Sequence, residues 1–160
     1  MDFGKPYSIR VRYCILLLFF CLITSKLFSQ SIFTNPINGS NPSSSNPFTN
    51  QQILNSNLTV SGIGFGSGLI ANAGDDRYNL RAWSTGALLL NDYIEFTLTP
   101  NASFKIDFTS FVYNASVSSN GPANFVLRSS LNNYLTDIAT LSATAGTVNL
   151  SSSTFQNVAS

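Results

Sequence analysis

Seven residues, Tyr93–Thr99, alternate between apolar and polar side chains before Pro100 ends the run. A β-strand sends successive side chains to opposite faces, so a strand here would put every second residue on one face. The side chains expected inside are Ile94, Phe96 and Leu98, and those expected outside are Tyr93, Glu95, Thr97 and Thr99. A helix does not tolerate a period of two, so this segment constrains the chain to a half-buried strand.

The residues after this strand extend the pattern. Pro100-Asn101-Ala102-Ser103 has the composition of a tight turn and leads into the alternating residues Phe104, Ile106 and Phe108. Residues 93–109 are therefore predicted to form a hairpin. The apolar positions then move from even to odd numbers, at 111 and 113, which predicts a β-bulge or a bend near Thr109 and Ser110.

Further short strand patterns lie on both sides of this region, at 57–63, 78–84, 124–129, 147–150 and 155–158. Residues 131–138 have helical spacing but weak helix formers, so they are predicted to be mostly loop. Strands with turn signals between them and no convincing long helix favour an all-β fold. The expected architecture is an antiparallel β-sandwich, jelly-roll-like in form.

The N-terminus carries an export pattern. Three cations, Lys5, Arg10 and Arg12, precede an apolar run at 13–23, which is shorter than the roughly 20 residues that a membrane-spanning helix needs. Residues 1–30 are predicted to be a helical, cleavable signal peptide, and the protein is expected to be secreted or displayed at the cell surface. Membrane contact is expected only transiently, through this peptide.

The only cysteines, Cys14 and Cys21, lie in that peptide, so the mature chain would hold no thiol or disulfide. A lipidated Cys21 is the alternative, although Phe19 and Phe20 stand where small residues are expected. With no histidine and no mature cysteine, the usual zinc sites, Ser-His-Asp triads and Cys-His dyads are excluded.

The charge composition after residue 30 limits the kinds of molecule that the mature chain is expected to bind. Four cations stand against six anions, for a net charge of −2, so no basic stripe is present and nucleic acid is not expected as a partner. Residues 31–56 are rich in Asn, Ser and Pro and are predicted to be a linker or a loosely docked lead-in, with Ile32, Phe33 and Phe48 as anchors. Residues 57–160 would form the β-sandwich domain, with glycines at 62–68 as flexible strand positions.

Three stretches, residues 81–86, 91–100 and 121–131, resemble a β-sandwich module found in secreted and cell-surface bacterial proteins, often large ones exported by the type IX route. The resemblance covers about residues 55–160 and carries no known chemistry. It implies further strands and further domains of a longer parent protein, so the domain is expected to be incomplete at its C-terminus.

Two groups of side chains are candidate sites. Trp83, Tyr78 and Tyr93 could form an aromatic platform for sugar stacking, although a single tryptophan is more often part of a core. Asp75 and Asp76 could offer oxygen ligands to a structural Ca²⁺, although an ordinary turn explains them as well. No other cofactor is expected.

Catalytic chemistry has one weak candidate, the carboxylates of Asp92 and Glu95, which are more simply explained as solvated or capping groups. Arg128 is expected to form a structural ion pair, with Glu95 or Asp107 as partner. The sequence thus favours a non-enzymatic exported module that binds polysaccharide or cell-surface matrix. A fragment of a secreted carbohydrate-active enzyme and a structural spacer without ligand are the alternatives.

Overall fold

The computed structural model describes residues 30–160, and residues 31–160 form one compact unit. Within the described residues the regular structure consists of short β-strands and three 3-10 turns, without an α-helix, and every strand pair is antiparallel. The predicted all-β class is thereby confirmed. The predicted signal peptide lies, apart from Gln30, outside the described residues. No helix in residues 30–160 is long and apolar enough to span a bilayer.

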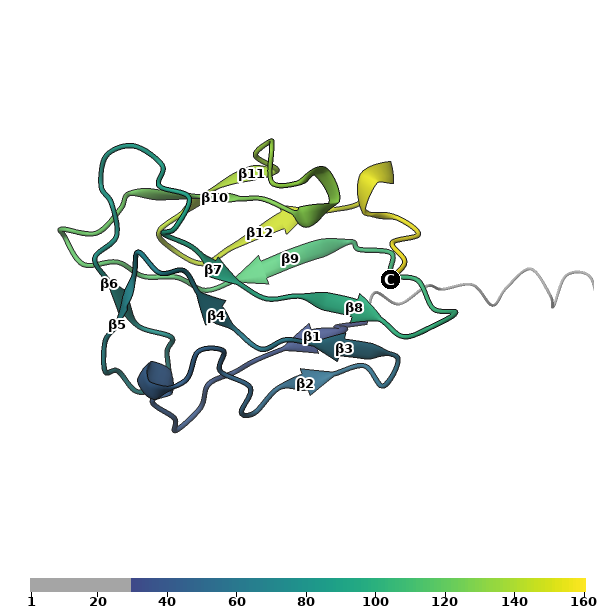
Figure 1. Ribbon diagram of the computed structural model, residues 1–160, viewed down its shortest axis with the longest axis horizontal. Coiled ribbons are helices and arrows are strands. Elements are labelled where there is room, and N and C mark those ends of the chain that lie inside the picture. Colours follow the sequence, from purple (N-terminus) through teal and green to yellow (C-terminus); the bar gives the residue numbers. More distant parts are fainter. Residues whose placement is uncertain (1–29) are drawn as a thin grey trace, which may run out of the picture. The chain divides into compact units, whose positions relative to one another are not determined.

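Twelve strands form six pairs (Figure 1). The pairs are β1 (Phe33–Thr34) with β2 (Ile53–Leu54), β3 (Leu58–Val60) with β8 (Leu98–Pro100), β4 (Gly64–Phe65) with β7 (Ile94–Glu95), β5 (Ile70–Ala71) with β6 (Leu80–Arg81), β9 (Ser110–Tyr113) with β12 (Gly146–Asn149), and β10 (Asn124–Leu127) with β11 (Ala139–Ser142). The 3-10 turns are η1 (Pro42–Ser44), η2 (Ser130–Asn132) and η3 (Ser153–Phe155).

The β3–β8 and β4–β7 pairs are one ladder interrupted by a β-bulge. Val60 faces Leu98 and Gly64 faces Glu95, so three residues on one strand lie opposite two on the other. The Ser61 hydroxyl accepts the Thr97 N–H at 2.9 Å, which replaces a backbone carbonyl at the bulge. The bulge turns Ile63 toward Phe48, and the two residues exchange backbone hydrogen bonds of 2.8 and 2.9 Å.

The predicted hairpin over 93–109 is wrong. A tight turn is present, since the Phe104 N–H donates to the Asn101 carbonyl at 3.0 Å. Its two arms nevertheless separate, because β8 pairs with β3 while the chain after the turn pairs with the C-terminal segment. The turn therefore carries the chain from one strand pair to another, a connection whose local turn composition does not differ from that of a hairpin.

The shift in apolar positions near Thr109 and Ser110 is present, because both residues are exposed between half-buried Phe108 and Phe111. The residues that have no counterpart lie not at Thr109 and Ser110 but on the opposite segment, after β12. Leu150 N–H donates to the Thr109 carbonyl, whereas the next bond, from Phe108 N–H, goes to the Phe155 carbonyl, so residues 151–154 have no counterpart and include the start of η3.

The segment 31–56 is packed into the same unit as the rest of the domain. Phe48 and Ile37 are buried, and so is Pro42 at the start of η1. The Asn46 side chain holds both backbone groups of Phe65, accepting its N–H at 3.0 Å and donating to its carbonyl at 3.1 Å. The segment expected as a linker or loosely docked lead-in is therefore packed on the domain, with Phe48 buried as an anchor and Asn46 bonded to the backbone of Phe65.

The core is small and partly aromatic. Its buried apolar side chains are Ile37, Phe48, Leu58, Leu69, Ile106 and Leu150. Beside them the ring of Phe96 lies between Phe33 at 5.4 Å and Phe111 at 6.0 Å, measured between ring centroids. Phe96 and Leu98 thus point inward as predicted, whereas Ile94, on the same parity, is largely exposed.

Candidate functional site

The three residues of the predicted aromatic platform do not come together. Tyr78 packs its ring against Phe48 and Phe65, with centroids 6.5 and 5.8 Å away, and its hydroxyl donates to the Ser45 carbonyl at 2.8 Å. Burial raises the pKa of the Tyr78 phenol above its ordinary value of 10.0. Tyr78 therefore fastens the segment 45–48 to the domain and does not offer a free ring face.

Trp83 and Tyr93 have separate environments. Trp83 meets Phe125 edge to face, with centroids 5.3 Å apart, and is half-buried. Tyr93 is exposed, and a Cβ at Gly66 would overlap the Asn91 carbonyl oxygen and come within 2.6 Å of the Tyr93 ring carbon Cε1. The close approach of this backbone and ring explains why a glycine stands at position 66 better than strand flexibility does.

Asp75 and Asp76 lie in an exposed turn. The Asp76 carboxylate accepts the N–H of Gly39 at 2.5 Å, and the Asp76 N–H donates to the Ser40 carbonyl at 3.0 Å. No group of three or more His, Cys, Asp or Glu side chains within residues 30–160 is arranged to hold a metal ion. Asp76 thus connects this turn to residues 39–40 through two hydrogen bonds.

Asp92 has a structural role at the base of the loop between β6 and β7. Its Oδ2 accepts the Ser84 N–H at 2.9 Å, and its carboxylate lies so close to Gly68 that a Cβ there would overlap it. Glu95 lies on β7, where it is exposed. Asp92 therefore joins two loop ends, which supports capping over acid–base chemistry.

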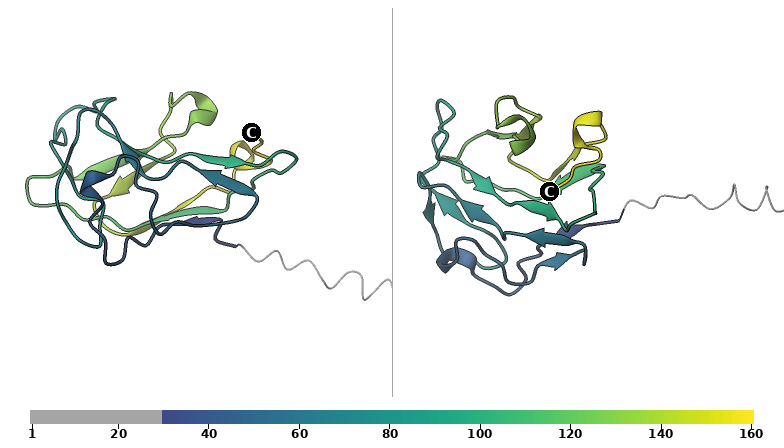
Figure 2. Two further views of the ribbon diagram at one scale, coloured as in Figure 1. Left: turned by 60° about the horizontal axis from the view of Figure 1, so that its bottom comes forward. Right: turned by 45° about the vertical axis from the view of Figure 1, so that its right-hand side comes forward.

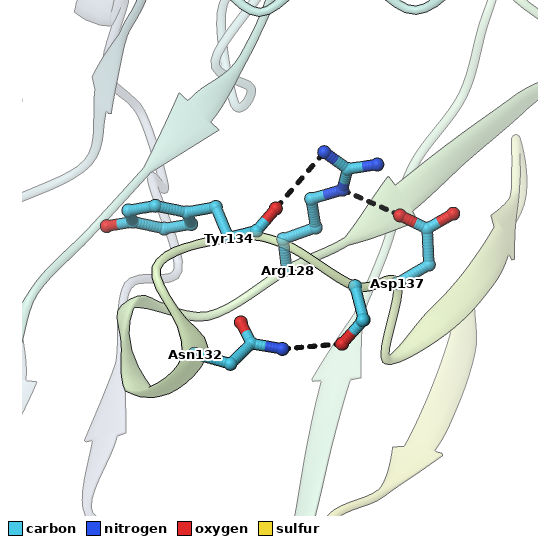
Figure 3. A network of polar contacts seen from close by, with 5 residues as sticks. Arg128, Asn132, Tyr134 and Asp137 are labelled. Carbon is cyan, nitrogen blue, oxygen red and sulfur yellow. Dashed lines mark hydrogen bonds and ion pairs between the residues drawn. The ribbon is translucent and has the colours of Figure 1, made fainter.

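Arg128 forms its ion pair with Asp137, at 2.6 Å, so the predicted partners Glu95 and Asp107 are wrong. The same guanidinium donates to the Tyr134 carbonyl at 3.2 Å. Figure 3 shows these two bonds together with the bond from the Asn132 amide to the Thr136 hydroxyl, 2.5 Å long. The network closes the loop between β10 and β11, in which Asn133 and Tyr134 both adopt positive φ.

A shallow, open pocket of about 200 Å³ lies beside the turn at 101–104. Its lining combines apolar and polar side chains. The apolar lining is Ile32, Leu58, Pro100, Phe104 and Ile106, and the polar lining is Asn55, Asn57, Lys105 and Asp107. About half of the Phe104 side chain is exposed, which leaves a ring available at the pocket edge.

Two of the four polar lining side chains already accept hydrogen bonds from the backbone, and two do not. The Asp107 Oδ1 accepts the Asn157 N–H at 2.6 Å, and the Asn55 Oδ1 accepts the Asn57 N–H at 2.9 Å. The side chains of Asn57 and Lys105 are exposed and form no hydrogen bond or ion pair with other described residues. An amide and an ammonium group are thus available beside the Phe104 ring.

Sequence reasoning missed this pocket. Phe104 shares the parity of Ile106 and Phe108, so alternation alone does not distinguish its exposed ring from a core side chain. The lining comes from four separate segments, at 32, 55–58, 100 and 104–107, which no local motif connects. The sequence signal that was present is the Asn-Ser-Asn stretch at 55–57, whose side chains stand next to the buried Leu58.

Comparison with models of protein families, with curated proteins and with solved structures found no match for this chain. The chemistry of the described residues is therefore the basis for a functional proposal.

Proposed function

We propose that the chain is an exported, non-catalytic β-sandwich module of a bacterial surface or secreted protein that binds polysaccharide or cell-surface matrix. The pocket beside Phe104 is the observation that supports it. An exposed ring beside amide and charged groups suits a sugar, because one face of a pyranose is apolar while its hydroxyls need hydrogen-bonding partners.

The sandwich form is supported by the strand connections. The turn at 101–104 carries the chain from the β3–β8 pair to the β9–β12 pair, and the rings of Phe96 and Phe111 meet between those pairs. Crossings of this kind connect the two sheets of sandwiches and jelly rolls, whose inner faces share a core.

Binding without catalysis is supported by the content of the pocket. Glycoside hydrolysis ordinarily needs two carboxylates on opposite sides of the scissile bond. Asp107 is the only carboxylate among the lining residues, and one of its oxygens already holds the Asn157 N–H. No observation on the described residues favours the enzyme-fragment alternative.

The test is polysaccharide binding by the full chain, first on a glycan array and then by affinity electrophoresis in gels containing each polysaccharide that scores. Phe104→Ala is expected to weaken binding about tenfold, which corresponds to the loss of one stacking contact. Lys105→Ala is expected to weaken it by a smaller factor.

The control variant is Tyr113→Phe, which changes another aromatic side chain outside the pocket and is expected to leave binding unchanged. If no polysaccharide binds the unaltered chain, the spacer alternative replaces the proposal. Binding that Phe104→Ala leaves intact would place the ligand elsewhere.

A further inference from the structure

The loop between β6 and β7 exposes three consecutive leucines. Leu88, Leu89 and Leu90 are 54%, 47% and 79% exposed, respectively. Scattered single apolar side chains are ordinary on protein surfaces, whereas a contiguous apolar tip marks a contact site. From this tip we propose that the loop inserts into a lipid surface.

The base of the loop is fastened, so the leucines are held outward. Besides the Asp92–Ser84 bond, the Ser84 hydroxyl donates to the Ala87 carbonyl at 3.1 Å and the Asp92 N–H donates to the Leu89 carbonyl at 3.2 Å. These two bonds satisfy the carbonyls of Ala87 and Leu89, which lowers the cost of bringing them near lipid. The loop is thus suited to shallow insertion at the boundary between headgroups and acyl chains, where water still reaches its other backbone groups.

The chemistry of the tip favours lipid over a protein partner. A protein groove accepts one face of an extended segment, so it would bury alternate side chains. Here three successive side chains are exposed, which fits a medium that is apolar in every direction. The residues from Ser84 to Asn91 carry no charge, so none has to lose its hydration on insertion.

A second loop strengthens the inference. The loop closed by Arg128 and Asp137 exposes Leu131, Tyr134 and Leu135, the last of them by 77%. Both loops project from the same side of the unit in Figures 1 and 2. Tyrosine favours the boundary between lipid and water, so Tyr134 suits a position at the headgroups.

This contact differs from the transient one expected of the signal peptide, and it needs no anionic lipid, because no cluster of basic residues flanks the leucines. The loop is therefore expected to bind zwitterionic lipid surfaces as tightly as anionic ones. The test must separate this contact from the apolar residues 13–23, so it uses a probe at the loop.

The probe is a tryptophan placed in the full chain in a Trp83→Phe background, since Trp83 is the only native tryptophan. Leu89→Trp reports on the loop, and Val112→Trp, at an exposed position on β9, is the matched control. Both are mixed with phosphatidylcholine vesicles whose acyl chains carry bromine, which quenches tryptophan only at short range.

Tryptophan at 89 is expected to shift its emission to the blue and to be quenched, while tryptophan at 112 shows neither change. With Leu88→Ser and Leu90→Ser added, the vesicle concentration needed for half-maximal quenching is expected to rise about tenfold. Equal quenching at both positions, or none at 89, overturns the proposal. A concentration-dependent blue shift without vesicles points to self-association and overturns it too.

Discussion

The hydroxyl of Ser61 accepts the backbone N–H of Thr97 at 2.9 Å, while the Ser61 N–H donates to the Thr97 carbonyl at 3.1 Å. Ser61 thus bonds both backbone groups of Thr97 at the bulge. The bulge in turn positions Ile63, whose backbone pairs with Phe48 of the Asn/Ser/Pro-rich segment. The stability of that segment should therefore depend on side chains at the bulge.

Replacing Ser61 with alanine removes the acceptor but leaves the Thr97 N–H, which water reaches because Thr97 is exposed. The free energy of unfolding is expected to fall by about 1 kcal/mol, measured by urea denaturation. Ser61→Thr keeps the hydroxyl and is the control. A loss as large for threonine as for alanine would assign the effect to packing.

Gly62→Ala is expected to destabilise more strongly, by about 2 kcal/mol. Gly62 has φ of +93°, and a Cβ there would come within 2.7 Å of the Phe48 carbonyl oxygen. The expected loss has two causes, the strain of positive φ and the contact with Phe48. Gly39→Ala tests the first alone, because Gly39 also has positive φ but open space around it. Equal losses at 39 and 62 in thermal melts would contradict a role for the Phe48 contact.

Stability is expected to decline as pH rises above about 10 because of Tyr78. Its pKa is higher in the folded than in the unfolded chain, so the unfolded state releases this proton first and is favoured as pH rises. The contribution is complete below pH 10 and lost as pH rises through the folded pKa. Tyr78→Phe should remove this part of the slope in denaturation at pH 9 to 11, whereas Tyr134→Phe, at an exposed position, should retain it.

Phe125→Ala is expected to shift the fluorescence of Trp83 to the red, because the indole loses its edge-to-face neighbour and gains water. Phe65→Ala, which alters a ring that meets Tyr78, should leave the emission maximum unchanged. Emission that Phe125→Ala does not move would show that Trp83 is solvated in the native state and would restore it as a platform residue.

The sequence predicted those features that depend on the alternation of side chains along one segment. The inward positions of Phe96 and Leu98 and the strands near 58–60 and 124–127 follow from local pattern. Ile94 has the same pattern as Phe96 but lies where little covers it. Alternation gives the face of a strand, whereas burial depends on what packs over that face.

The partners of each strand could not be predicted, because they depend on segments far apart in the chain. The side chain of Asn46 bonds the backbone of Phe65, nineteen positions away along the chain. Nothing in the dipeptide Asn46-Pro47 indicates this contact. The ion pair of Arg128 with Asp137 closes a loop that contains two successive residues with positive φ, Asn133 and Tyr134, and no local pattern indicates this conformation. Such conformations are uncommon for residues other than glycine.

The bond between Asp107 and the backbone of Asn157 joins residues fifty positions apart, next to the bridge between Ile106 and Val158. Contacts of this separation close late, since the chain between them must first lose its freedom. Ile106 and the Phe104 pocket are therefore expected to be completed late in folding, once residues 157 and 158 have docked beside residues 106 and 107. Until then the pocket beside Phe104 is expected to stay unformed, even where the earlier strand pairs have already closed.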